Sequence, residues 1–230
     1  MQDHQFVKPL LPKELYKPRV LPLWLFPSNL PPKSLTIEEK LCANKLSAKR
    51  SKQFAHSRSH IRHALSELWG LPALSIPLDA PPGKAPELGS GWGHISISHC
   101  CDALLIGWSN EKIGVDIERS DRKFSAKKIC SRYYSHKEKQ YLNNLTDKEF
   151  NCAVLKKWIA KESCIKWQKG SINSDLVEWI ISEPIKYAIH NSIKYKVRVQ
   201  CIDFGPWIIS IASEKILAIK QPIICLNSKF

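Results

Sequence analysis

The sequence predicts an α+β protein with two similar α/β halves, in which antiparallel sheets are packed by helices in a pseudo-twofold arrangement. The predicted elements follow the order strand, helix, strands, helix, strands, which favours an α+β fold. A three-residue connection, residues 110–112, joins two predicted strands and is typical of an antiparallel hairpin. We expect residues 1–112 to form the N-terminal half and residues 113–230 to form the C-terminal half.

The N-terminal half is predicted to begin with a strand and a long helix. Val20–Phe26 is a strand-like run within a proline-rich start. Residues from Leu35 to Gly70 predict a helix, with Thr36 as the N-cap ahead of acidic first-turn residues. Gly70 followed by Pro72 predicts the end of this helix.

Three strands and a second helical region are predicted in the middle of the chain. The strands are His94–Ser98, Ala103–Ser109 and Ile113–Glu118, the last two forming the hairpin. Ser120–Gly170 is mainly helical in pattern. The remaining strand candidates alternate apolar and polar residues, and they are Val177–Ser182, Lys194–Cys201, Pro206–Ser213 and Ile216–Ile219.

The composition is that of an ordinary globular protein with an excess of basic residues. The chain has 230 residues, of which 43% are hydrophobic and 24% charged, enough for one large domain or two small ones. The formal net charge of +14 predicts attraction to a polyanion. Nucleic acid, a phosphorylated small molecule, an acidic protein and an anionic membrane surface all satisfy this charge.

The cysteines and the apolar runs bear on the cellular compartment. The eight cysteines are scattered and form no C-x₂-C pair, which argues against a structural zinc site. Residues 1–18 lack the apolar core of a secretory signal. The longest uncharged run, Val20–Pro32, is too short to span a bilayer. We therefore expect a cytoplasmic protein with no membrane partner.

Two carboxylates share one face of the predicted strand Ile113–Glu118. Because strand side chains alternate between faces, Asp116 and Glu118 point the same way, about 7 Å apart. Such a pair calls for a positive charge between the carboxylates, and Mg²⁺, which takes oxygen ligands and phosphate oxygens, is the usual solution. A solvated acidic face on an edge strand is the alternative.

A second acidic position lies in the helical run Ala153–Trp167. Glu162 and Lys166 stand one turn apart, on or beside an otherwise apolar stripe. They are either a simple i,i+4 ion pair or a third oxygen ligand for the acidic strand with a lysine beside it for a phosphate.

Three more features suit phosphate binding. Ser98 and His99 end a predicted strand, and Lys84 lies in a flexible turn. The long N-terminal helix is basic and includes Arg50 and Arg58. The alternatives are a capping or core-edge histidine, an ordinary loop and a solvated helix face.

Taken together, these segments resemble the Sfp-type 4′-phosphopantetheinyl transferases. Gly114–Glu118 matches the G-[IV]-D-[IVL]-E motif of that family, and Trp158–Lys166 matches W-x-x-K-E-[SA]-x-x-K in full. Ser98–Cys100 resembles the S-H-S motif, Gly83–Pro86 the G-K-P loop, and Phe54–Arg62 the F-x-x-x-R-x-x-[LI]-R stretch. The departures are Cys100 in place of the second serine and Ala85 in place of the proline. If either family side chain supplies a needed contact, its replacement lowers the affinity for the coenzyme.

The resemblance implies the transferase fold and its chemistry. Coenzyme A is the co-substrate, Mg²⁺ binds its pyrophosphate, and a carrier-protein serine attacks the β-phosphate with release of 3′,5′-ADP. The implied enzyme is a holo-[acyl-carrier-protein] synthase.

The resemblance also implies residue roles. The implied metal ligands are Asp116, Glu118 and Glu162. The implied catalytic residues are Glu162 as base, Lys166 for the leaving group, and Glu138 in support of the base. The implied contacts to the coenzyme's phosphates are Arg50, Arg58, Lys84, Ser98, His99 and Lys166.

The implied partner is an acidic acyl or peptidyl carrier protein, contacted through Arg119–Tyr134. We expect a monomer that binds neither nucleic acid nor membrane. Three other functions are alternatives: a basic nucleic-acid-binding module, a Mg²⁺-dependent phosphodiesterase or nuclease, and an inactive relative that only binds a carrier. The first predicts steep salt dependence and indifference to coenzyme A, the second predicts hydrolysis without a carrier, and the intact acidic set argues against the third.

Overall fold

The computed structural model describes residues 21–214 and 223–226. The predicted strand Ile216–Ile219 lies outside these residues. The described chain divides into two compact units, the first holding residues 21–95, 101–110 and 223–226 and the second holding residues 96–100 and 111–214. Helices and mainly antiparallel sheets make up both units, so the predicted α+β class is confirmed. The first unit departs from the predicted antiparallel pattern where Pro22–Leu25 pairs in parallel with Ile223–Leu226. The pseudo-twofold arrangement stays a prediction.

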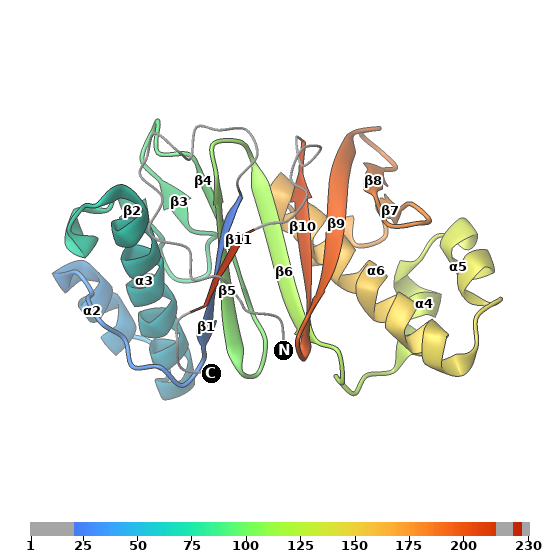
Figure 1. Ribbon diagram of the computed structural model, residues 1–230, viewed down its shortest axis with the longest axis horizontal. Coiled ribbons are helices and arrows are strands. Elements are labelled where there is room, and N and C mark those ends of the chain that lie inside the picture. The colour runs from blue at the N-terminus through green and yellow to red at the C-terminus, as the bar shows by residue number, and fades with distance from the viewer. Residues whose placement is uncertain (1–20, 215–222, 227–230) are drawn as a thin grey trace. The chain divides into compact units, whose positions relative to one another are not determined.

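The first unit contains two helices and short strands (Figure 1). Its elements in chain order are β1 (Pro22–Pro27), α2 (Ile37–Asn44), α3 (Ala48–Trp69), the 3₁₀ turn η1 (Ala73–Ser75), β2 (Leu78–Asp79), β3 (Glu87–Leu88), β5 (Ala103–Ser109) and β11 (Ile223–Leu226). The strand β4 (His94–His99) begins in this unit, and its residues from Ser96 onward belong to the second. One sheet has the order β11–β1–β5–β4, and β2 pairs with β3.

The second unit has a five-stranded sheet and most of the helices. Its elements are β6 (Ile113–Arg119), α4 (Ala126–Tyr133), α5 (His136–Leu142), α6 (Asp147–Gln168), α7 (Ile172–Asp175), β7 (Trp179–Ile181), β8 (Tyr187–His190), β9 (Lys196–Phe204) and β10 (Trp207–Ser213). The sheet order is β6–β10–β9–β8–β7, and every neighbouring pair is antiparallel.

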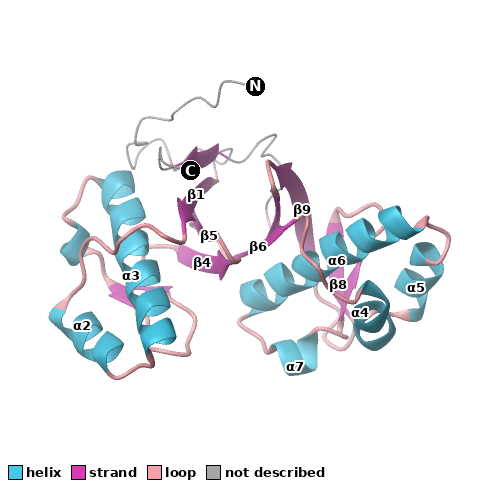
Figure 2. Cartoon of the chain, turned by 90° about the horizontal axis from the view of Figure 1, so that it is seen from below, coloured by secondary structure: helices cyan, strands magenta, loops and turns pink. Residues whose placement is uncertain are grey.

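The predicted helix Leu35–Gly70 is two helices. α2 ends at Asn44 and α3 begins at Ala48, and Figure 2 shows the two side by side. Thr36 caps α2 as predicted: its Oγ1 accepts from the Glu39 amide at 3.2 Å, and the Glu39 carboxylate accepts from the Thr36 amide at 2.9 Å. Gly70 ends α3 with a φ of 65°, a left-handed conformation that glycine adopts without steric cost.

The predicted hairpin between Ala103–Ser109 and Ile113–Glu118 is wrong. Both segments are strands, β5 and β6, but they belong to different sheets. β5 pairs antiparallel with β1, and β6 pairs antiparallel with β10, a strand about 90 residues later in the sequence. A short connection signals a hairpin only when the two strands have no better partners, and here both have them.

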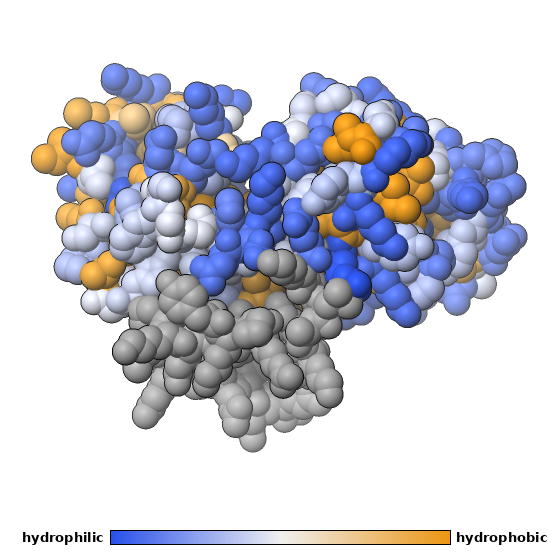
Figure 3. Space-filling model, turned by 90° about the horizontal axis from the view of Figure 1, so that it is seen from above, coloured by the Kyte–Doolittle hydropathy of each residue, from blue (hydrophilic) through white to orange (hydrophobic). Residues whose placement is uncertain are grey.

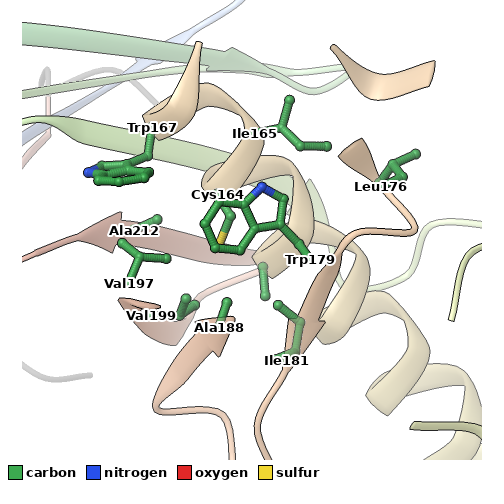
Figure 4. Packing of buried hydrophobic residues seen from close by; sticks show 11 residues of the cluster. Cys164, Ile165, Trp167, Leu176, Trp179, Ile181, Ala188, Val197, Val199 and Ala212 are labelled. Atoms are coloured by element: carbon green, nitrogen blue, oxygen red, sulfur yellow. The ribbon is translucent and has the colours of Figure 1, made fainter. Parts of the chain in front are cut away.

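The helix α6 covers one face of the five-stranded sheet (Figure 1). The core between helix and sheet is built around Trp179, which is fully buried, with Cys164 of α6 in the same cluster (Figure 4). The other buried members of this cluster are Ala160, Ile165, Trp167, Leu176, Ile181, Ala188, Val197, Val199 and Ala212. This packing fixes α6 against the sheet and so fixes the polar residues on its sheet-facing side.

The surface in Figure 3 is mainly hydrophilic, with apolar residues in separate groups. Exposed apolar side chains include Ile37 and Leu41 of α2. Over the residues that the structure describes, no helix combines the length and apolar character needed to cross a membrane.

Candidate active site

The site forms where β6 meets α6 at very close range. Gly114 of β6 has no room for a side chain, because a Cβ there would overlap the backbone carbonyl oxygen of Ser163 in α6. Strand side chains alternate, so Asp116 and Glu118 share the face on which Gly114 meets the helix. Behind this contact, the Ser163 hydroxyl lies 2.9 Å from that of Ser210 on β10, in the position opposite Asp116.

Asp116 is the buried centre of the site. Its side chain is 2% exposed, and its Oδ1 accepts hydrogen bonds from Ser98 Oγ at 2.6 Å and from Lys166 Nζ at 2.7 Å. Its Oδ2 is buried and has no hydrogen-bond partner among the described residues. A buried carboxylate oxygen without a donor is costly, so a positive group is expected to complete this site.

The pKa values of Glu162 and Glu118 are both raised by burial and by neighbouring negative charges. Burial, together with the charges of Asp116 and Glu118, raises the pKa of Glu162 to about 8. Burial, followed by the charge of Asp116, also raises the pKa of Glu118, against the lowering effect of Arg122. The three carboxylates on this strand and helix therefore act on one another electrostatically, and Lys166 is ion-paired with one of them, Asp116.

Arg122 is a member of the site that the sequence reasoning missed. Its Nη1 donates to Glu118 Oε1 in a close ion pair. The turn after β6, closed by a 3.1 Å hydrogen bond from the Arg122 amide to the Arg119 carbonyl, brings the guanidinium back toward the strand. An arginine four residues after a strand carboxylate, across a turn, was the available signal.

The serines of β4 attach this strand to β6. Ser96 Oγ accepts from the Val115 amide at 3.0 Å, and Ser98 Oγ is the donor to Asp116 described above. Ser98 is therefore a neighbour of the acidic set, whereas the sequence predicted only a phosphate contact for it. His99 follows at the end of β4 and is half-buried.

Glu138 lies in a separate buried network. Its Oε2 accepts from Lys161 Nζ at 3.2 Å and from the Ser135 amide and hydroxyl, each at 2.9 Å. Its Oε1 accepts from the Ile181 amide at 3.1 Å. Lys161 itself is fully buried, and it donates to the carbonyls of Leu176 and Trp179 as well. Glu138 thus ties α5, α6 and β7 together.

The other predicted phosphate contacts belong to the first unit. Arg58 is buried in α3: its Nε donates to the Ala80 carbonyl at 2.8 Å, its guanidinium lies 4.6 Å from the Phe54 ring centroid, and burial lowers its pKa to about 10. Arg50 is exposed near the start of α3, and Lys84 is exposed in the turn before β3. A shared site between these residues and the acidic set stays a prediction.

The residues fit a divalent cation through their chemistry. As the side chains lie, the described ranges hold no group of three or more His, Cys, Asp or Glu residues arranged to bind a metal. Asp116, Glu118 and Glu162 nevertheless interact electrostatically, and the buried Oδ2 of Asp116 has no hydrogen-bond partner among the described residues. Oxygen donors of this kind are those that Mg²⁺ prefers.

A comparison with protein families agrees with this geometry. Residues 112–212, somewhat less than half of the chain, match the model of the 4′-phosphopantetheinyl transferase superfamily. The chain therefore carries a domain of that superfamily, which supports phosphopantetheine transfer as its general activity. The match includes β6 and α6, with Asp116, Glu118, Glu162 and Lys166. No curated protein matches the chain.

Proposed function

We propose that the protein transfers the 4′-phosphopantetheine arm of coenzyme A to a serine hydroxyl of an apo acyl or peptidyl carrier protein, with Mg²⁺ as cofactor and 3′,5′-ADP as the leaving product. One observation carries the proposal. Inside the superfamily match, the strand with Asp116 and Glu118 faces the helix with Glu162 and Lys166, and Lys166 Nζ lies 2.7 Å from Asp116. A solvated acidic edge would leave Asp116 exposed, whereas its side chain is 2% exposed.

Asp116, Glu118 and Glu162 are the residues that would hold Mg²⁺. When bound, Mg²⁺ neutralises charge on the pyrophosphate of coenzyme A, which is a large contribution in phosphoryl transfer. The free Oδ2 of Asp116 gives such a cation an oxygen that no other described residue uses.

Lys166 is placed to contact both Asp116 and a substrate phosphate in this reaction. Its ammonium is held by Asp116, yet the side chain is 29% exposed, so it is able to contact a phosphate oxygen from the same position. A fixed cation beside the pyrophosphate stabilises the negative charge that grows on the departing 3′,5′-ADP. This role requires no proton transfer by the lysine.

Glu162 is the better candidate for the base that takes the proton of the attacking serine, directly or through a water molecule. Glu138 already accepts four hydrogen bonds, two from Ser135 and one each from Lys161 and Ile181. Both of its oxygens are thus occupied, and its side chain is 2% exposed. We therefore assign Glu138 a structural role.

The partner is expected to be acidic. The outer face of α4 carries Lys127, Lys128 and Arg132, all exposed, whereas Ala126 and Cys130 face the core. A basic face on a helix that packs against α6 suits an acidic carrier domain, because opposite charges steer the encounter.

The test is a mass measurement on apo carrier proteins incubated with the full chain, coenzyme A and Mg²⁺. We expect a gain of about 340 Da on one serine, the mass of the phosphopantetheine group. A panel of fatty-acid, polyketide and peptide-synthetase carriers would identify the substrate class. Glu162→Gln and Asp116→Ala should each abolish the gain while circular dichroism shows an intact fold.

The competing functions predict different results in the same assay. Release of 3′,5′-ADP without modification of any carrier would indicate a phosphodiesterase. Binding to nucleic acid that weakens steeply with salt, in the absence of any transfer, would indicate a nucleic-acid-binding module. No mass gain across the whole panel would overturn the proposal.

A further inference from the structure

The contact between Arg122 and Glu118 has no role in the proposed reaction. Arg122 lies in the turn after β6, and its Nη1 donates to Glu118 Oε1. The side chain of Glu118 is 19% exposed and that of Arg122 is 38% exposed. The carboxylate is thus enclosed by the protein on most sides, whereas its arginine partner reaches it from the solvent.

The two cations near the acidic set differ in what they have to do. Lys166 pairs with Asp116 and is placed to contact substrate phosphate. Arg122 pairs with Glu118, and its charge also acts on Glu162. Arginine keeps its positive charge near neutral pH, so a cation that binds Glu118 has to compete with this guanidinium.

We propose that Arg122 is an internal counterion that competes with the divalent cation for Glu118 and thereby sets the cation affinity of the site. The inference rests on the proposed function, because it assumes that Glu118 is a cation ligand. A carboxylate that accepts from a guanidinium is a weaker ligand for a cation, because part of its negative charge is already neutralised. A monovalent cation a few ångströms from a divalent one also repels it.

Because Arg122 is exposed, replacing its guanidinium at Glu118 with a divalent cation costs little free energy. A guanidinium that leaves Glu118 moves into water, where its charge is well solvated, and exposed ion pairs contribute little to stability. The carboxylate of Glu118 gains a doubly charged partner in place of the guanidinium. Removal of Arg122 should therefore strengthen cation binding by about three- to tenfold at low ionic strength, and less in high salt, where the charge is screened.

The experiment titrates Mn²⁺ into the full-length protein and follows the electron paramagnetic resonance signal of the free ion. It is performed with and without saturating coenzyme A, with coenzyme A alone as the reference. The variants are Arg122→Gln, Glu118→Gln and the double variant. Arg119→Gln is the matched control, because it removes the same charge from the residue that begins this turn, and the Arg119 guanidinium pairs with Asp121.

We expect Arg122→Gln to bind Mn²⁺ more tightly than the parent protein, Arg119→Gln to change affinity by less than about twofold, and the effect of Arg122→Gln to vanish in the Glu118→Gln background. Equal Mn²⁺ affinities for Arg122→Gln and Arg119→Gln would overturn this inference but leave the proposed function standing. Weaker binding by Arg122→Gln would also overturn it, since Arg122 would then orient Glu118 as a ligand. If the parent protein binds no Mn²⁺ with or without coenzyme A, the proposed cation site and this inference both fail.

Discussion

Lys161 and Glu138 form an ion pair of 3.2 Å inside the second unit, and both side chains are almost completely buried. Lys161 directly precedes Glu162 in α6, so these two adjacent side chains point into different parts of the unit. Lys161 anchors α6 to α5 and β7, whereas Glu162 faces the strand that carries Asp116 and Glu118.

This separation predicts the effect of Glu138→Gln. The change leaves the ammonium of Lys161 buried with only carbonyl partners, so the free energy of unfolding should fall by about 3 kcal/mol. At a temperature where the variant is folded, its kcat should stay within about threefold of the parent value, because no reacting atom is touched. Urea unfolding and carrier modification measure the two effects. A Glu138→Gln variant of normal stability with no turnover would instead make Glu138 the base.

Gly114→Ala should damage stability and activity together. The added Cβ would overlap the Ser163 carbonyl, which is backbone and cannot rotate away, so β6 and α6 must separate. Overpacking of this kind costs about 1–3 kcal/mol, and the separation also moves Glu162 away from Asp116. Thermal unfolding and transfer assays would show both losses. Gly89→Ala is the control, because its nearest contact is the Pro77 side chain at 3.3 Å, and normal activity in Gly114→Ala would refute the role of the close contact.

Charge reversal on the outer face of α4 should weaken carrier recognition. Lys127→Glu together with Lys128→Glu removes exposed positive charge without touching the buried side of the helix. We expect KM for the carrier to rise at least about fivefold, KM for coenzyme A to stay unchanged, and the difference to shrink in high salt. Steady-state kinetics at two ionic strengths provide the measurement. An unchanged KM for the carrier would place its docking surface elsewhere.

His60 should make the stability of the protein depend on pH. Burial lowers the pKa of His60 from 6.5 to about 4. The ring lies 4.6 Å from that of Phe26, and its Nδ1 is 2.7 Å from the His56 carbonyl. The unfolded chain therefore binds more protons between these two pH values. The free energy of unfolding should be fully retained above about pH 6.5 and fall by up to about 3 kcal/mol as the pH drops to 4.

Denaturant unfolding at several pH values measures this effect. His60→Asn keeps a side-chain donor for the His56 carbonyl but does not titrate, so it should flatten the profile. His136→Asn, which replaces an exposed histidine at the start of α5, is the matched control. An identical slope in His60→Asn and the parent protein would exclude His60 as the source.

The sequence predicted the local parts of the site well and the pairing of its strands poorly. The alternation that sets Asp116 and Glu118 on one face is a local property of a strand, and the reciprocal cap of Thr36 and Glu39 is a local property of a helix start. The partner of β6 is β10, which follows it by about 90 residues, and no local pattern specifies such a distant choice. The short link before Ile113 therefore pointed to the wrong neighbour.

The interior polar contacts were beyond the sequence for the same reason. A repeat of lysine and glutamate along α6 gives no sign that Lys161 is fully buried while Lys166 is 29% exposed. The strand β8 was also missed, since its four residues are too few to show a period. Arg122 escaped notice because its partner depends on how the chain turns after β6.

The pairing of β1 with β11 has a consequence for biosynthesis. β1 begins at Pro22, yet one of its two hydrogen-bonded neighbours is made of residues 223–226. An emerging polypeptide thus carries the apolar segment Leu23–Phe26 with an unsatisfied edge until residues 223–226 have been translated about 200 residues later. Expression strains with ample ribosome-associated chaperones, and fusion tags placed at the amino end, should give the best yield of folded material.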